Sequence, residues 1–187
     1  MTAMTAHVPS TLVTAPRITA DEFLSGDHPI GSELVDGVVY EMDPAFDHQE
    51  VVSRLLTALR EQTDHGRAGI GGNWVLADGH VYKPDVWWKA QRPRGVRHDG
   101  PPELAIEVRS PGTWALDVGP KLRQYEAAGT TELWLVDTAS STVLVFRRDD
   151  SGPGFADAVE FAAGEELTSP LLPGFALDVD ALFADLG

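Results

Sequence analysis

The sequence of 187 residues contains no cysteine, which excludes disulfide bonds, thiolate zinc sites and cysteine nucleophiles. No apolar run approaches the ~18 residues that a membrane span needs. Residues 1–16 also lack the basic segment followed by an apolar block that is typical of a signal peptide. We therefore expect a cytoplasmic protein without membrane attachment, with a flexible tail over residues 1–16 and one domain over residues 17–187.

Positive charge is also scarce, because 14 Lys and Arg residues against 29 Asp and Glu residues give a net charge of −15. This sign disfavours a protein that grips a long nucleic acid duplex. The charge is unevenly distributed, however. Residues 83–98 contain five cations and one acid, whereas residues 149–187 contain nine acids and no Lys or Arg. The basic segment is either a solvated loop or a source of positive potential at a cleft.

Sequence motifs of several enzyme classes are missing. There is no G-x-S-x-G nucleophile elbow, no Walker loop and no dinucleotide-binding fingerprint. The histidines His65, His80 and His98 do not have the spacing of a zinc site.

Hydrophobic periodicity and turn residues predict an α/β (mixed α+β) fold with an N-terminal β-hairpin and a central mixed sheet flanked by helices. The dipeptide Asp36-Gly37 favours a tight hairpin turn, and Gly129 is a favoured helix end. The expected elements are a hairpin over 33–42, a helix over about 47–66, strands over 73–77, 81–89 and 103–109, a helix over 118–128, a hairpin over 132–148 and a short helix within 171–186.

Two acidic residues on neighbouring strands predict a metal site. In residues 103–109, Leu104, Ile106 and Val108 alternate with Glu107 and Arg109, so the two charged side chains share one face. Asp85 follows Pro84 on the preceding strand. Mg²⁺ prefers oxygen ligands and usually takes one or two carboxylates from a protein. Asp85, Glu107 and the carbonyl of Val108 could supply such ligands.

Cations near these acids could neutralise the charge on a phosphoryl group, and Arg109 and Lys121 are the candidates. Pro120 is expected at the first position of the helix, which would place Lys121 in the first helical turn. The helix dipole disfavours a cation there by roughly 0.3–1 kcal/mol, so Lys121 is easier to explain if it faces carboxylates or an anion. Tyr125 lies one turn further along the same face, and the two could frame a phosphate.

Each candidate also has a structural interpretation. Glu107 could pair with Arg109, Asp85 could be a turn residue, Lys121 could be solvent-exposed and Tyr125 could pack in the core. His48, near the start of a helix, could contact a phosphate, orient Glu33 or be a half-exposed residue without function. Lys83, in the basic segment, is a further candidate for binding substrate.

The combination of these residues resembles the core of PD-(D/E)XK nucleases. The chain is more closely similar to the Uma-two family of restriction-endonuclease-like proteins. The similar stretches cover about residues 20–185 and are Glu33-Leu-Val-Asp-Gly, His48 with its helix, Lys83-Pro-Asp-Val, Pro102-Glu-Leu-Ala-Ile-Glu-Val-Arg-Ser-Pro, Asp117-x-x-x-Lys121-x-x-x-Tyr125, Ala128-Gly-Thr-Thr-Glu-Leu-Trp-Leu-Val-Asp137 and Leu172-Pro-Gly-Phe.

This resemblance implies a homodimer and a site for Mg²⁺ or Mn²⁺ with Asp85 and Glu107 as ligands. It also implies that Glu33 is an additional acidic site residue. Lys121 would replace the lysine that usually follows two residues after the glutamate. This chain has Arg109 at that position, and a guanidinium cannot act as a base.

The favoured function is that of a metal-dependent endonuclease that hydrolyses phosphodiester bonds in nucleic acid, with DNA as the favoured substrate. Two alternatives remain open. The chain could be a catalytically silent binding or regulatory module with a nuclease fold, or it could hydrolyse a small phosphate ester, which suits its acidity better.

Overall fold

The structure, a computed structural model, describes residues 16–41, 45–110, 112–149 and 152–186. The predicted tail over residues 1–16 lies outside the described residues, apart from Pro16. Among the described residues, no helix is long and apolar enough to cross a membrane.

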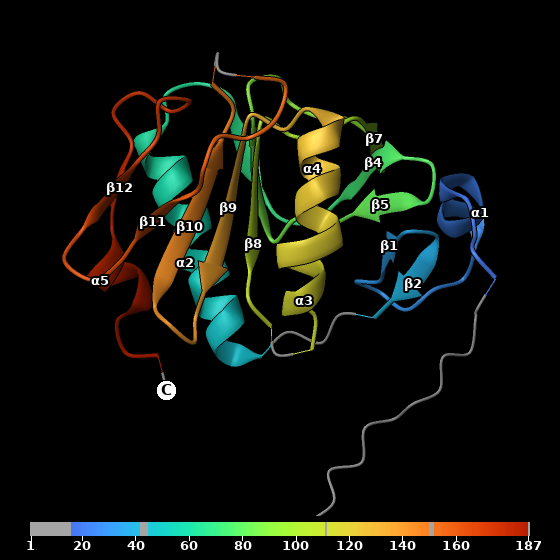
Figure 1. The fold of residues 1–187 in the computed structure, drawn as a ribbon, viewed down its shortest axis with the longest axis horizontal. Coiled ribbons are helices and arrows are strands. Elements are labelled where there is room, and N and C mark those ends of the chain that lie inside the picture. The colour runs from blue at the N-terminus through green and yellow to red at the C-terminus, as the bar shows by residue number, and fades with distance from the viewer. Residues whose placement is uncertain (1–15, 42–44, 111, 150–151, 187) are drawn as a thin grey trace, which may run out of the picture.

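The largest sheet has six strands in the order β11-β10-β9-β8-β6-β3 (Figure 1). The two central strands β8 and β9 are parallel, and the other neighbours are antiparallel. The strands are β3 (Arg67–Gly69), β6 (Val86–Lys89), β8 (Leu104–Val108), β9 (Glu132–Asp137), β10 (Thr142–Arg147) and β11 (Val159–Phe161).

A second sheet has five strands in the order β2-β1-β5-β4-β7, and a third sheet pairs β12 with β13. The strands of these two sheets are β1 (Glu33–Val35), β2 (Val38–Tyr40), β4 (Asn73–Ala77), β5 (His80–Tyr82), β7 (Arg97–Asp99), β12 (Glu166–Thr168) and β13 (Ala176–Asp178). The expectation of one central mixed sheet is therefore confirmed for the six-stranded sheet, while the N-terminal hairpin belongs to the five-stranded sheet.

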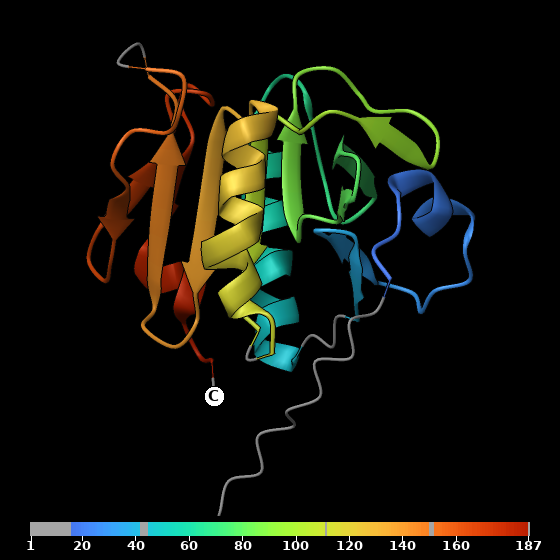
Figure 2. The ribbon, with the colours of Figure 1, turned by 45° about the vertical axis from the view of Figure 1, so that its right-hand side comes forward.

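Helices cover both faces of the six-stranded sheet, with α4 (Leu122–Ala128) in front of it and α2 (Phe46–Gln62) behind it (Figures 1 and 2). Val51, Leu55 and Leu59 of α2 pack into the larger core together with Trp88, Ile106 and Trp134 of the sheet. On the other face, Tyr125 of α4 packs with Ala105, Leu133 and Leu135. This burial is the main force that holds the sheet between the helices.

Two short helices complete the fold. The first, α1 (Ala20–Ser25), was not predicted. It begins at Thr19, whose side chain accepts a hydrogen bond from the Glu22 N–H, while the Glu22 carboxylate accepts one from the Thr19 N–H. The second, α5 (Val179–Phe183), confirms the short helix predicted within 171–186.

The hairpin turn is confirmed, because Asp36 and Gly37 both have positive φ, of 50° and 74°. The predicted strand over 81–89 is wrong as a single element. It is divided into β5 and β6, which belong to different sheets. Pro84 lies between them, and a proline cannot donate a hydrogen bond to a sheet. Residues 92–102, for which no element was predicted, also contain a strand, β7, which pairs in parallel with β4.

The predicted helix over 118–128 begins earlier and is not uniform. It consists of α3 (Trp114–Leu116), a π-helical turn η1 (Asp117–Lys121) and α4, and it ends at Gly129 with φ 96° as expected. Pro120 lies inside η1 and not at the first helical position, so Lys121 is not in the first turn. The wider π-helical turn accommodates a proline whose missing N–H breaks the α-helical hydrogen bonding.

The hairpin that carries Glu33 depends on Gly37. A Cβ at this position would lie 2.8 Å from Arg17 Cβ and 3.2 Å from the Ile18 carbonyl oxygen. We expect Gly37→Ala to lower the free energy of unfolding by about 1–2 kcal/mol, because it adds both backbone strain and this clash. Urea denaturation measures the change. Gly119→Ala is the control, since its Cβ would meet nothing within 4 Å; equal destabilisation by both variants would contradict the prediction.

Candidate functional site

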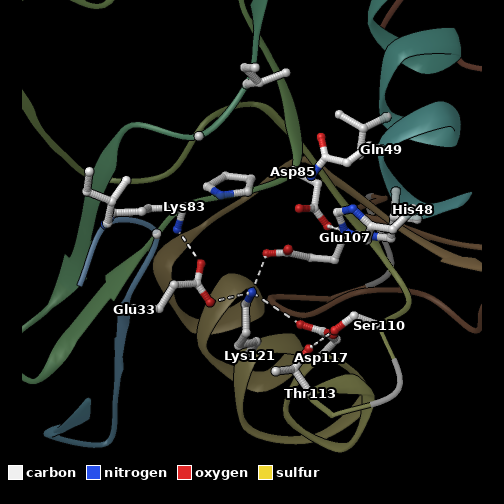
Figure 3. Close-up of a pocket in the computed structure, with 17 residues that line it drawn as sticks. Glu33, His48, Gln49, Lys83, Asp85, Glu107, Ser110, Thr113, Asp117 and Lys121 are labelled. Atoms are coloured by element: carbon white, nitrogen blue, oxygen red, sulfur yellow. Dashed lines mark hydrogen bonds and ion pairs between the residues drawn. The ribbon is translucent and has the colours of Figure 1, made fainter. Parts of the chain in front are cut away.

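A cavity of about 320 Å³ lies where the two main sheets meet (Figure 3). Its polar lining comes from β1, the start of α2, the break between β5 and β6, the end of β8 and the π-helical turn. These lining residues include Glu33, His48, Lys83, Asp85, Glu107, Val108, Ser110, Thr113, Asp117 and Lys121. The structure thus brings together most of the residues that the sequence singles out.

At the base of the cavity, Lys121 is surrounded by three carboxylates (Figure 3). Its Nζ lies 2.9 Å from Glu33 Oε2, 2.9 Å from Glu107 Oε1 and 3.2 Å from Asp117 Oδ1. None of these four side chains is more than 5% exposed. We call Lys121, Glu33, Glu107 and Asp117 the buried ionic cluster.

Local backbone geometry explains how the cluster forms. Asp117 and Lys121 are four residues apart in η1, so their side chains lie on the same side of the turn. Glu33 is held at its other oxygen, where Oε1 accepts a hydrogen bond from the backbone N–H of Lys83. Glu107 Oε1 also accepts a hydrogen bond of 2.6 Å from the Tyr125 hydroxyl. The expectation that Lys121 faces carboxylates agrees with this geometry, although the helix-dipole argument for it was wrong.

Burial and mutual repulsion shift the protonation of the cluster. Burial, together with the charges of Glu33, Asp117 and Asp85, raises the pKa of Glu107 well above its ordinary value, against the opposing effect of Lys121. Burial likewise raises the pKa of Asp117 to about 6. Burial alone would lower the pKa of Lys121, but Glu107, Glu33 and Asp117 together raise it well above the ordinary value. Lys121 therefore stays a cation at neutral pH.

Asp85 approaches the same cavity from the break after β5. The register of β6 and β8 pairs Val86 with Ile106, so Asp85 and Glu107 are the next opposed positions. Asp85 Oδ2 accepts a hydrogen bond of 2.8 Å from the Val108 N–H and lies 3.0 Å from His48 Nε2. His48 Nδ1 is buried without a hydrogen-bond partner. His48 thus contacts Asp85, and no hydrogen bond joins it to Glu33.

The structure places the remaining candidates differently. Arg109 does not line the cavity, because its Nη1 lies 2.9 Å from both carboxylate oxygens of Asp137 and its guanidinium lies 5.7 Å from the Trp114 ring centroid. Tyr125 is fully buried behind Glu107, so it contacts the cluster and not the cavity. Lys83 lines the cavity, and burial lowers its pKa against the opposing charge of Glu33.

Asp117 is a member of the cluster that the sequence interpretation missed. The spacing Asp117-x-x-x-Lys121 was visible as an (i, i+4) acid–base pair. Such pairs are common on exposed helix faces, however, and nothing in the sequence indicated that this one is buried. Ser110 and Thr113 were also missed, and their hydroxyl groups lie 2.6 Å apart at the cavity wall.

The donor set of the cavity fits a hard divalent cation with few protein ligands. Within the described residues, no three His, Cys, Asp or Glu side chains form a group that could hold a metal ion by themselves. Mg²⁺ usually keeps several waters and takes only one or two carboxylates together with substrate phosphate oxygens. Asp85 Oδ1 and Glu107 Oε2 have no hydrogen-bond partner in the described part of the chain. Two such oxygens fit this mode of binding.

The architecture is that of a mixed α+β protein with a central mixed sheet between helices. A solved structure described as a "putative nuclease belonging to DUF820" from Anabaena variabilis has the same fold, with a TM-score of 0.77 and 21% sequence identity over 89% of this chain and 97% of that chain. The model of the Uma2 family, described as "Putative restriction endonuclease", matches residues 21–180. The chain therefore belongs to the Uma2 family, which confirms the resemblance to Uma-two proteins. No curated protein matches the chain.

The raised pKa of Asp117 makes stability depend on pH. A carboxyl that titrates at about 6 when folded and at 3.8 when unfolded contributes stability at low pH that is lost as the pH rises through this window. Asp117→Asn cannot ionise. Its free energy of unfolding should therefore improve relative to the wild type by an order of 2 kcal/mol between about pH 4 and about pH 7.

Urea unfolding of both proteins across this range measures the difference. Asp137→Asn is the control, because Arg109 and backbone N–H groups overcome the effect of burial and lower the pKa of Asp137. That variant should lose stability relative to the wild type as the pH rises. A pH-independent difference for Asp117→Asn would contradict the prediction.

Proposed function

We propose that this protein is a divalent-metal-dependent endonuclease that hydrolyses phosphodiester bonds in nucleic acid. The observation that carries the proposal is the position of Asp85 and Glu107. They occupy opposed positions at the ends of β6 and β8, line the same cavity, and each has one carboxylate oxygen without a partner among the described residues. Asp85 and Glu107 would hold Mg²⁺ or Mn²⁺, and the carbonyl of Val108 is a further candidate ligand.

The bound metal would supply a Lewis acid for a phosphoryl oxygen and lower the pKa of a water molecule. The residues of the chain orient and balance this site. His48 and the Val108 N–H hold one oxygen of Asp85, which leaves the other directed to a ligand. Tyr125 and Lys121 hold Glu107 in the same way.

Lys121 acts in this proposal as a fixed positive charge. Its raised pKa excludes it as a base at neutral pH, because an ammonium has no free electron pair. A buried cation at the base of the cavity stabilises negative charge on a phosphoryl group. Lys83, which also lines the cavity, is a candidate contact for a phosphate oxygen. Glu33 holds Lys121 and the backbone of Lys83 in place.

A catalytically silent module is the second candidate. The observation that favours it is that Lys121 is paired with three carboxylates of the protein itself. Such pairing is also what a cluster with only a structural role would show. The net charge of −15 points in the same direction. Hydrolysis of a small phosphate ester remains the third candidate. The homodimer, the choice of DNA and the cytoplasmic location stay predictions.

Metal binding tests the site directly. We expect isothermal titration calorimetry to detect binding of Mn²⁺ to the wild type and to detect none in Asp85→Asn or Glu107→Gln. Both variants remove the charge of a ligand while preserving its size. Glu166→Gln, an exposed acid on β12, is the control and should bind like the wild type. Binding that persists in both site variants would exclude Asp85 and Glu107 as the ligands.

The two candidate cations can be separated by their effect on hydrolysis. Lys121→Met should lower kcat for Mn²⁺-dependent hydrolysis of an oligonucleotide by a factor of about 100 or more, because the transition state loses its fixed positive charge. Arg109→Met should retain kcat within about threefold, because it removes the pair with Asp137 and the contact with Trp114 and no group at the cavity. Gel-based cleavage assays measure both rates.

Thermal unfolding of the two variants provides the necessary control. Lys121→Met leaves three buried carboxylates without their cation, which costs roughly 3–5 kcal/mol. The rates are therefore compared at a temperature at which both variants are folded. A loss of activity in Arg109→Met with full activity in Lys121→Met would reverse the assignment of the catalytic cation.

A further inference from the structure

A second, larger cavity of about 680 Å³ lies beside the candidate site. Ile70 and Gly71 line both cavities, so the two are neighbours. The walls of the second cavity come from the end of α2, from β3, from the start of β4 and from the connector before β8. In Figure 2 this connector, with β7, forms the light-green arm at the upper right.

Positive charge is concentrated in this second cavity. Five of the 14 Lys and Arg residues of the chain line it, and no Asp or Glu does. The five are Arg60, Arg67, Arg92, Arg94 and Arg97. Three of them belong to the basic segment of the sequence, and the fold adds Arg60 and Arg67 from the opposite wall. We call this cavity the arginine cleft.

Most of this charge is not neutralised by the protein. Arg92 and Arg94 are exposed and make no ion pair with any described residue. Arg60 and Arg67 donate hydrogen bonds only to carbonyl oxygens, those of Ala68 and Gly66. Arg97 alone is paired, with Asp21 at 2.6 Å and Asp99 at 2.8 Å. Four guanidinium groups of the cleft thus remain available to an anion.

The floor of the cleft allows a ligand to approach the backbone. It contains Gly69, Gly71 and Gly72, and at Gly71 even an added Cβ would meet no other atom within 4 Å. Trp87 Nε1 is buried without a hydrogen-bond partner. Glycine and tryptophan thus line the cleft together with the five arginines.

We propose that the arginine cleft binds the phosphodiester backbone of a nucleic acid on one side of the phosphate that is cleaved. The inference rests on the proposed function and deepens it, because it makes a polynucleotide the substrate and not a small phosphate ester. Guanidinium groups bind phosphate through paired hydrogen bonds. A backbone that occupies the cleft would continue past Ile70 and Gly71 into the candidate site. A small ester that fills only the smaller cavity would make no contact with the cleft.

The test is the double variant Arg92→Ala/Arg94→Ala. Binding of short fluorescein-labelled oligonucleotides is measured by fluorescence anisotropy in EDTA, so that neither metal nor cleavage contributes. Single-stranded DNA, duplex DNA and RNA are compared. We expect a roughly tenfold loss of affinity at moderate salt. The slope of log K against log salt should also decrease in magnitude by about 0.7–0.9 for each arginine removed.

The matched control is Arg17→Ala/Arg123→Ala. Both residues are exposed and neither lines the cleft. Because each variant removes two arginines, the control has the same net charge as the test variant. It should bind with the affinity of the wild type. Equal loss in both variants, or no oligonucleotide binding by the wild type, would overturn the proposal.

The result is independent of whether the candidate site is active. If the wild type binds oligonucleotides through the arginine cleft but cleaves none, the inference holds and the proposed catalytic function fails. If the wild type hydrolyses a small phosphodiester with Mn²⁺ but binds no oligonucleotide, the candidate site stands and the inference fails.

Discussion

The ion pairing of Lys121 is the interaction on which the rest of the site depends. An isolated charge removed from water costs several kcal/mol, and only good geometry with opposite charges offsets this cost. Glu33, Glu107 and Asp117 supply that geometry at 2.9, 2.9 and 3.2 Å. They come from β1, β8 and η1, so one ammonium group ties the small sheet, the large sheet and the helix together. The position of the hairpin relative to the core is thus fixed by electrostatics as well as by packing.

The cluster contains more acid than base, and this imbalance determines what the cavity attracts. Three carboxylates share one ammonium, and the pKa values of Glu107 and Asp117 are raised as a result of burial and of the neighbouring negative charges. Asp85 adds a fourth carboxylate at the cavity wall. The cavity therefore favours a cation, while the neighbouring arginine cleft favours an anion. A metal ion held by these carboxylates and a phosphate held by the arginines would then occupy adjoining regions of opposite charge.

Elements with strong local signals could be predicted from the sequence. The Asp36-Gly37 turn, the helix of Val51, Leu55 and Leu59, and the alternation of side chains between the two faces of β8 were found because each is set by its own residues. Contacts between distant segments could not be found in this way. The assignment of β5 and β6 to different sheets and the pairing of β7 with β4 depend on neighbours far along the chain. For the same reason, residue spacing could not predict that Asp117 is buried. It also could not predict that Arg60 and Arg67 line the arginine cleft. The π-helical turn has a local cause, but Pro120 was expected at the first helical position and lies inside the helix.

The net charge of −15 opposes nucleic acid binding only if the charge is treated as uniform over the surface. The acidic C-terminal segment forms β11, β12, β13 and α5, at the opposite end of the molecule from β4 and β7 (Figure 1). Salt screens exposed charges beyond about 8 Å at physiological ionic strength. A phosphate in the arginine cleft would therefore experience the nearby guanidinium groups much more strongly than the distant acids. The same distribution keeps the remaining surface acidic, so that the protein would hold a polyanion at the cleft and repel it elsewhere.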